Sequence, residues 1–260
     1  VDDKQFGFRK KRSTAQPMFH YRRMIEIQEE AAWESHTILL DWEKAFDKVH
    51  PTRMILALWR LGVPDKVVRV IKALYRRPNF NIKEGESDSG KRAQGSGIRQ
   101  GCPLSPYLVI LLMTVIMYDI QENLTEEEKE ILKEGELHKE VCKYILYADD
   151  TILFTKTAEA AELLRRIQIE SRKYNLSLNE SKCRHWPINF MHSIKCLNGN
   201  VVPKQEKATY LGGLIAKSSD HRLEIRSRIA ATWMTVKKLD LLWKSSAASK
   251  KWKLSVFEAV

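Results

Sequence analysis

The sequence has few of the residues that mark several large protein classes. Its 260 residues include four cysteines at scattered positions, too few for the disulfide framework of a small secreted domain. The eleven glycines and eight prolines form no repeat and no linker-like stretch, which excludes a collagen-like or low-complexity chain. The longest mostly apolar run, residues 108–118, is too short to cross a bilayer. We therefore expect a soluble intracellular protein with free thiols, no secretory leader and no membrane segment.

Positive charge is in excess, and the excess lies at the two ends of the chain. Residues 1–23 carry a net charge of +5 and residues 217–260 carry +6, so the remainder is neutral overall. A hydrophobic fraction of 43% is enough to bury a core, which excludes wholesale disorder, and the length suits one large domain or two subdomains. Basic ends on a neutral body suit a polyanion held between two arms, with solubility alone as the alternative explanation.

Apolar periodicity and turn residues predict a mixture of helices and strands. Predicted helices cover residues 13–33, 51–60, 64–75, 103–118, 159–174 and 219–243, and predicted strands cover residues 37–40, both arms of 79–94, 141–147, 151–155 and 209–215. The helix over 103–118 is apolar nearly all round, so we expect it at the centre of the fold. The glutamate-rich stretch 122–140 is expected to be a solvated helical excursion without a chemical role.

Two helices have apolar positions that predict a buried face. In the helix after Pro64 these positions are Val67, Val68, Ile71 and Tyr75. In the basic helix after residue 219 they are Ile225, Ile229, Trp233, Val236 and Trp243. In the hairpin over 79–94 the turn is expected around residues 87–90. The chain ends within an expected further helix, so we expect an excised domain.

Three aspartates follow or join apolar strands. Asp41 ends the strand over 37–40, and Asp149 and Asp150 lie between two predicted strands, at the tip of a hairpin. Such strands would hold the acids at one edge of a sheet, where their mutual repulsion requires a counter-charge such as Mg²⁺. Two such ions can stabilise the attacking and leaving oxygens of a phosphoryl displacement. For an isolated Asp-Asp pair, a polar hairpin turn is the alternative.

Six segments, in order, resemble the conserved blocks of reverse transcriptases. They are QFGFR (residues 5–9), LDWEKAFD (40–47), RQGCPLSP (99–106), YADD (147–150), LSLNESK (176–182) and YLG (210–212). The sequence is most similar to non-LTR (LINE-type) retrotransposon enzymes, with group II intron enzymes as nearer cousins than retroviral ones. The resemblance implies an α+β fold: a right-hand polymerase palm, with an antiparallel sheet backed by helices, partial fingers and the start of a helical thumb.

The resemblance also implies a division of the chain and a set of partners. Residues 1–34 would be a fingers remnant, 35–60 palm, 61–98 a fingers/palm insertion with a hairpin, 99–216 palm and 217–260 the start of a truncated thumb. The family's first fingers block, an endonuclease, a Cys-rich tail and an RNase H-like segment are not found in the sequence. The implied partners are an RNA template, a DNA primer, dNTPs and other domains of a longer polyprotein, an endonuclease and a nucleic-acid-binding tail. The implied location is the nucleus or a retroelement ribonucleoprotein.

The resemblance carries roles to individual positions. Asp41, Asp149 and Asp150 would be catalytic and would bind two Mg²⁺ ions, with Mn²⁺ as an alternative. Phe46 would place a ring beneath the incoming sugar and exclude a ribose 2′-OH; a core phenylalanine is the alternative. Lys182 would act as a proton donor or a cation beside the departing pyrophosphate; a surface lysine is the alternative. The remaining implied contacts are Gln100, Gly101, Tyr147 and Ala148 for the substrate, and Arg9, Tyr210, Leu211 and Gly212 for primer or template. For Arg9 a solvated basic tail is the alternative.

Two further interpretations remain open. Cys183, His185, His192 and Cys196 could be drawn as a Cys₂His₂ zinc site, although the Cys-x-His start departs from the usual ligand spacing. The second alternative concerns function: a catalytically inactive, domesticated retroelement fragment that acts as a nucleic-acid-binding module. The intact Asp41, Asp149 and Asp150 favour an RNA-directed DNA polymerase that extends a DNA primer on an RNA template.

Overall fold

The computed structural model describes residues 1–32, 34–99, 101–123, 144–189 and 191–259. The chain divides into two units, Val1–Glu206 and Lys207–Val260. The first contains α1 (Ala15–Glu30), β1 (Ser35–Leu40), α2 (Ala45–Lys48), α3 (Pro51–Arg60), α4 (Asp65–Leu74), β2 (Asn79–Phe80), β3 (Lys83–Glu84), β4 (Ser87–Asp88), β5 (Arg92–Ala93), α5 (Ser105–Glu122), β6 (Tyr144–Tyr147), β7 (Asp150–Lys156), α7 (Thr157–Arg172) and β8 (Arg184–Ile188). The second contains β9 (Lys207–Tyr210), β10 (Gly213–Ala216), α8 (Arg222–Lys238), α9 (Asp240–Lys244) and α10 (Lys250–Ala259).

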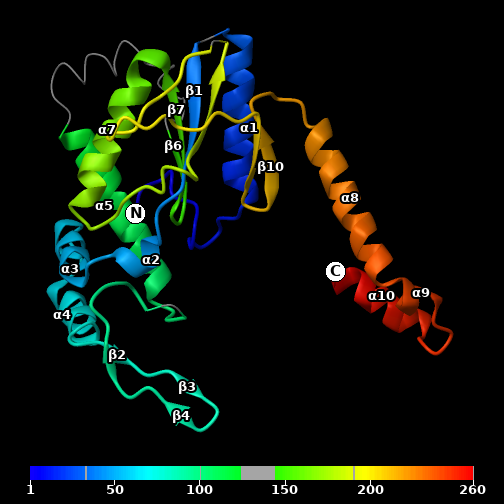
Figure 1. Ribbon diagram of the computed structural model, residues 1–260, viewed down its shortest axis with the longest axis horizontal. Coiled ribbons are helices and arrows are strands. Elements are labelled where there is room, and N and C mark those ends of the chain that lie inside the picture. The colour runs from blue at the N-terminus through cyan, green and yellow to red at the C-terminus, as the bar shows by residue number, and fades with distance from the viewer. Residues whose placement is uncertain (33, 100, 124–143, 190, 260) are drawn as a thin grey trace. The chain divides into compact units, whose positions relative to one another are not determined.

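A four-stranded antiparallel sheet lies at the centre of the first unit. Its strand order is β6-β7-β1-β8, and helices cover both of its faces, with α5 and α7 on one side and α1 on the other (Figure 1). On the α5 and α7 side, Ile38 and Leu153 are fully buried in the main core. On the α1 side, Tyr21 packs against the rings of Phe154 and Trp186 at centroid distances of 6.1 and 6.2 Å. The predicted antiparallel sheet backed by helices is confirmed.

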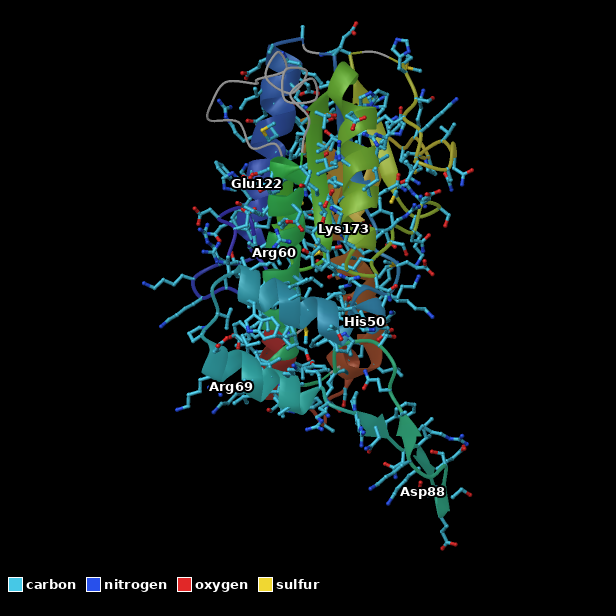
Figure 2. All side chains as sticks on the ribbon, turned by 90° about the vertical axis from the view of Figure 1, so that its left-hand side faces the viewer. His50, Arg60, Arg69, Asp88, Glu122 and Lys173 are labelled. Carbon is cyan, nitrogen blue, oxygen red and sulfur yellow. The ribbon has the colours of Figure 1, made fainter. Side chains whose placement is uncertain are left out.

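Helix α5 is the most deeply buried helix of this unit, as its composition predicts. Its single buried acid, Asp119, accepts hydrogen bonds from Arg60 of α3 and from Tyr174, which follows α7; the Tyr174 bond is 2.6 Å long. The guanidinium of Arg60 also donates to the Tyr174 hydroxyl at 2.6 Å. Arg60 lies where α3 meets α5 (Figure 2). Because a buried carboxylate is costly unless it is paired, this contact stabilises the packing of α3, α5 and α7.

Most of the predicted elements are present, with bounds shifted by a few residues. Helix α3 has the predicted bounds, and Leu164, Ile167 and Tyr174 are buried in the core as expected of the helix over 159–174. The predicted helix over 13–33 is α1, although the Thr14 side chain makes no capping hydrogen bond. Trp33, residues 124–140 of the glutamate-rich stretch and residues 141–143 of the strand predicted over 141–147 lie outside the described residues. No helix in the described part of the chain is both long and apolar enough to span a bilayer.

Two local predictions in this unit are wrong. Val67 is 46% exposed, whereas Val68, Ile71 and Tyr75 are buried, because a helix turns about 100° per residue and Val67 falls outside the arc that the other three share. In the 79–94 hairpin, β3 pairs with β4 so that the chain reverses at residues 85–86 rather than at 87–90. Gly85 takes a φ of +58° there, which glycine adopts without strain. Asp88 lies on this hairpin, which extends away from the helix that carries Arg69 (Figure 2).

The second unit consists of the β9–β10 hairpin and three helices. The strand predicted over 209–215 is the hairpin itself. The buried face predicted for α8 is wrong for Ile225, Ile229 and Trp233, which are 54%, 52% and 62% exposed. The only buried side chain of α8 is Glu224, which accepts a hydrogen bond from the Leu214 backbone at 2.5 Å. A unit of this size has too few elements to cover every apolar position of a long helix.

Candidate active site

The register of the central sheet places two of the predicted acids opposite each other. Leu40 at the end of β1 is the partner of Thr151 in β7. Asp41 is one residue beyond Leu40 and Asp150 one residue before Thr151, so both stand at the same edge of two neighbouring strands and on the same face. Asp149 lies in the two-residue turn between β6 and β7, whose last pair is Tyr147 with Asp150. The sheet therefore brings the three acids to one edge.

The charges of these acids act on one another. Partial desolvation, followed by the charge of Asp149 and then that of Asp41, raises the pKa of Asp150 to about 6. Asp150 is exposed to solvent, so the charges of the two neighbouring acids contribute to its raised pKa in addition to desolvation. Burial, and to a smaller extent the charge of Asp41, also raises the pKa of Asp149. Within the described residues, no salt bridge involves any of the three carboxylates.

The donor chemistry of this edge fits a hard divalent cation. Carboxylate oxygens are preferred ligands of Mg²⁺ and Mn²⁺, and a cation would relieve the repulsion that raises the pKa of Asp149 and Asp150. As the side chains lie, no group of three or more His, Cys, Asp or Glu residues in the described ranges is close enough to hold a metal ion by itself. Waters and substrate phosphates complete most magnesium sites, so the protein need not supply a closed cage.

The segment that follows α7 runs alongside the first acid. The Asn179 N–H donates to the Asp41 carbonyl at 2.8 Å, and the Glu43 N–H donates to the Ser177 carbonyl at 2.9 Å. Lys182 is exposed at the end of the same turn. The fold thus brings the predicted Leu176–Lys182 block next to Asp41 in space.

Trp42, directly after β1 and Asp41, links this end of β1 to the start of β7 through a side-chain hydrogen bond. Its side chain is 7% exposed, and its indole N–H donates to the Thr151 hydroxyl at 3.2 Å. The buried indole and this hydrogen bond limit how far the ends of β1 and β7, next to Asp41 and Asp150, can separate.

The block over residues 5–9 lies against the central sheet. Gln5 forms a parallel bridge with Leu146 of β6, and its side chain reaches the turn residue Ala148. The guanidinium of Arg9 donates to the carbonyls of Asp2 and Gln5 at 2.9 and 3.1 Å, so Arg9 ties its own segment together. The contact between Gln5 and the hairpin was not predicted, because nothing local in the sequence links residues 143 positions apart.

The family is decided by comparison over most of the chain. Residues 1–215 match the family described as reverse transcriptase (RNA-dependent DNA polymerase). The chain belongs to the reverse transcriptase family.

The relatives of this reverse transcriptase domain are retrotransposon proteins. It is 29% identical over 149 residues to the retrovirus-related Pol polyprotein from type-1 retrotransposable element R2 of Nasonia vitripennis, a match that covers 56% of this chain and 13% of the polyprotein. It is 24% identical over 248 residues to the probable RNA-directed DNA polymerase from transposon BS of Drosophila melanogaster, covering 89% of this chain and 25% of that protein. The predicted similarity to non-LTR, LINE-type reverse transcriptases is confirmed, and the chain spans a quarter or less of these two relatives.

A solved structure shares the fold. Apo telomerase from Candida Tropicalis, truncated from its C-terminal domain, superposes with a TM-score of 0.56 at 14% identity, covering 83% of this chain and 40% of that one. A second structure of apo telomerase from the same organism gives a TM-score of 0.51 at 13% identity. At this identity the likeness concerns fold alone, and it is consistent with a polymerase palm.

Two predicted nucleotide contacts of this reverse transcriptase domain, Phe46 and Gly101, lie on segments outside the β6–β7 hairpin. Phe46 is half-buried in α2 against the core, and its carbonyl accepts a 2.6 Å hydrogen bond from the Ile98 N–H. Gly97 donates to the Val49 carbonyl at 2.8 Å. Gly97 and Ile98 are therefore hydrogen-bonded to α2 and to Val49, the residue that follows it. Gly101 has a φ of +81° and open space around it. Gln100 lies outside the described residues.

Apart from Arg9, the predicted primer or template contacts lie at a hairpin tip in the second unit. Tyr210 ends β9 and is 2% exposed. Leu211 and Gly212 form the turn, with φ values of +48° and +78°, the pattern of a type I′ turn. A leucine in this conformation is strained, whereas glycine is not.

Three residues of the alternative zinc site, Cys183, His185 and Cys196, are buried in the first unit, whereas His192 is exposed. Cys183 and Cys196 are buried, and burial raises their thiol pKa values to about 11 and about 12. The His185 Nδ1 is 3.1 Å from the Val202 carbonyl oxygen. Among the described residues, no group of three or more His, Cys, Asp or Glu side chains is placed to hold a metal ion, so the structure does not favour the zinc site.

Proposed function

We propose that this reverse transcriptase domain is an RNA-directed DNA polymerase that extends a DNA primer with dNTPs on an RNA template. The observation that carries the proposal is the sheet register that sets Asp41 opposite Asp150, with Asp149 in the adjoining turn. Three carboxylates at one sheet edge, none of which forms a salt bridge within the described residues, suit phosphoryl transfer, because acids of this kind hold the divalent cations that stabilise the attacking and leaving oxygens. The primer 3′-OH would attack the α-phosphate of the dNTP, and pyrophosphate would leave.

Asp41 and Asp149 would hold two Mg²⁺ ions, with Mn²⁺ as an alternative, and Asp150 would complete the negative charge of the site. Bound there, the ions would lower the pKa of the 3′-OH and neutralise the triphosphate. The raised pKa of Asp150, about 6, supports a role in which this carboxyl becomes fully ionised when cations arrive. Lys182, exposed on the turn beside Asp41, would add positive charge or a proton for the pyrophosphate.

Phe46 would select deoxynucleotides. Its ring is partly buried against the core and its backbone is tied to Ile98, so it has little freedom to move away from a ribose 2′-OH. Gly101 and Gln100 on the same segment, with Tyr147 and Ala148 at the hairpin, would line the rest of the nucleotide pocket. Arg9, Tyr210, Leu211 and Gly212 would contact primer or template.

The parts of a right-hand polymerase would follow the chain as the resemblance implies. Residues 35–60 and 99–216 would form the palm, residues 1–34 and 61–98 fingers elements, and residues 217–260 the first helices of a thumb. The relatives that carry this domain are larger Pol proteins, which supports a longer polyprotein with an endonuclease and a nucleic-acid-binding tail. A nuclear or ribonucleoprotein location would follow from that context.

Primer extension on an RNA template with Mg²⁺ and dNTPs tests the proposal. Asp149→Asn should lower the rate of nucleotide addition by roughly 10³-fold, since several kcal/mol of transition-state stabilisation depend on metal held there. The matched control is Asp88→Asn, which makes the same chemical change at an exposed acid whose salt bridge with Lys83 is a surface contact. Its rate should equal that of the unaltered chain.

Metal binding supplies a readout that does not depend on activity. Addition of Mg²⁺ should raise the thermal stability of the unaltered chain and of Asp88→Asn more than that of Asp149→Asn, because only the first two keep the full cluster of repelling carboxylates. If the unaltered chain binds template-primer and Mg²⁺ but adds no nucleotide, the alternative of a nucleic-acid-binding module is correct. If Asp149→Asn retains full activity, the assignment of the metal-binding acids is wrong.

A further inference from the structure

The turn that carries Asp149 has a backbone conformation that needs support. Ala148, directly before Asp149, has a φ of +57°, in the left-handed region that alanine rarely adopts. Ala148 is also buried, at 6% exposed, so water cannot satisfy its backbone groups. Such a conformation persists only where the surrounding structure holds it.

The side-chain amide of Gln5 holds both backbone groups of Ala148. Its Oε1 accepts the Ala148 N–H at 2.8 Å, and its Nε2 donates to the Ala148 carbonyl at 3.0 Å. The same Oε1 accepts the Gly7 N–H at 2.8 Å, which fixes the orientation of the amide. Gln5 is 0% exposed, so these hydrogen bonds do not compete with water. One buried side chain thus satisfies both backbone hydrogen-bonding groups of the residue that precedes a predicted catalytic acid.

The backbone around Gln5 places its side chain against the turn. The Phe6 N–H donates to the Leu146 carbonyl at 2.8 Å, and the Leu146 N–H donates to the Lys4 carbonyl at 3.0 Å. Gly7 lies so close to the turn that a Cβ at this position would be 2.3 Å from the Ala148 nitrogen. The bridge between Gln5 and Leu146 of β6 therefore holds this segment against the turn, and only glycine fits at Gly7.

We infer that Gln5 is a positioning residue that holds the Ala148-Asp149 turn in place so that Asp149 and Asp150 face Asp41. This inference rests on the proposed polymerase function for its catalytic consequence. The three carboxylates repel one another, so a turn released from Gln5 would move the acids of the hairpin away from Asp41. Removal of a side chain that positions a metal ligand typically lowers activity or metal affinity 10- to 100-fold.

Hydrogen exchange tests the contact itself. Gln5→Met keeps the size of the side chain but removes all three hydrogen bonds of the amide. The matched control is Gln28→Met in α1, because Gln28 is also 0% exposed and its amide has no hydrogen-bond partner among the described residues. The Ala148 amide should exchange roughly tenfold faster in Gln5→Met than in Gln28→Met. Equal exchange in the two variants overturns the inference, whether or not the chain proves to be a polymerase.

Steady-state kinetics tests the catalytic consequence. In Gln5→Met we expect kcat to fall roughly 10- to 100-fold and the Mg²⁺ concentration for half-maximal rate to rise, with the dNTP KM changed by less than about threefold. Gln28→Met should resemble the unaltered chain in both respects. Faster exchange with unchanged kcat and Mg²⁺ dependence would reduce Gln5 to a structural residue and overturn the inference. Absence of activity in the unaltered chain would instead contradict the proposed function, and exchange would still decide the contact.

A second pair of variants covers the case in which Gln5→Met does not fold. Gly7→Ala retains the Gln5 amide but introduces a Cβ that would meet the Ala148 nitrogen. Gly95→Ala is its control, because a Cβ there meets nothing within 4 Å and its φ is not positive. Gly7→Ala should accelerate exchange at Ala148 and lower kcat, whereas Gly95→Ala should do neither. Identical behaviour of the two alanine variants would overturn the inference.

Discussion

Substitution of Gly97 by alanine should loosen the segment that we assign to the nucleotide pocket. Gly97 has a φ of +92°, and a Cβ there would be 2.8 Å from the Asp47 carbonyl oxygen and 3.0 Å from the Asp47 Cα. Both contacts are with backbone, which cannot rotate away as a flexible side chain can. The positive φ costs an alanine about 1–2 kcal/mol, and loss of the Gly97 to Val49 hydrogen bond costs about 1 kcal/mol more. We therefore expect Gly97→Ala to lower the free energy of unfolding by about 2–4 kcal/mol.

The assay compares two alanine variants that lie two residues apart. In Gly95→Ala the new Cβ meets open space at an unstrained φ. This variant should leave the free energy of unfolding unchanged or raise it by about 0.4–1 kcal/mol, because alanine lowers the conformational entropy of the unfolded chain. Urea unfolding followed by circular dichroism gives the midpoint for each. In primer extension, Gly97→Ala should also raise the dNTP KM, because Ile98 of the same segment is hydrogen-bonded to Phe46. Equal midpoints for the two variants would refute the reasoning from Cβ contacts and φ.

Three further predictions follow from other parts of the chain. Phe46→Val should increase incorporation of rNTPs relative to dNTPs by about tenfold or more in primer extension. An unchanged ratio of rNTP to dNTP incorporation would contradict the proposal that Phe46 excludes the ribose 2′-OH. Burial, then the positive charge of His185, lowers the pKa of His36 to about 3. Below pH 6.5, therefore, His36 is protonated in the unfolded chain but stays neutral in the folded chain until the pH approaches 3. Urea unfolding should therefore show about 2 kcal/mol less stability from this group at pH 5 than at pH 7, and His36→Gln should lose that part of the pH dependence. Asp119→Ala should lower the free energy of unfolding by about 2–4 kcal/mol, because Arg60 and Tyr174 lose their shared acceptor while Arg60 keeps some contact with water; a loss under about 0.5 kcal/mol would contradict a stabilising role.

Local patterns in the sequence were sufficient for most of the elements of the first unit. Three elements could be predicted from their own residues: the apolar run before Asp41, the hairpin around Asp149 and the all-apolar helix after Pro103. Each could be predicted because the spacing of apolar residues indicates whether an element is buried on one side or on all sides. The family resemblance rested on short blocks in order and was confirmed by the match over residues 1–215. Where several elements compete for one core, local patterns were less informative. Val67 is exposed although it is apolar, because its neighbours Val68 and Ile71 occupy the buried arc.

The second unit shows the same limit more strongly. The helical spacing of Ile225, Ile229 and Trp233 correctly predicts a helix, but not what covers it. Periodicity reports which residues share a face, and burial requires a second surface that periodicity does not describe. In this unit the hairpin buries Glu224 rather than the apolar stripe.

The sequence by itself determined which acids could do chemistry, where most of the strands and helices of the first unit lie, and which family the chain resembles. Only the tertiary structure decided that Asp41 lies opposite Asp150, because register depends on how β1 and β7 pack against α1, α5 and α7. It also decided that Gln5 supports the turn before Asp149, across 143 residues of chain. The physical reason is the same in both cases: propensity and periodicity act over a few neighbouring residues, whereas a buried hydrogen bond between distant segments forms only when the whole core has closed around it.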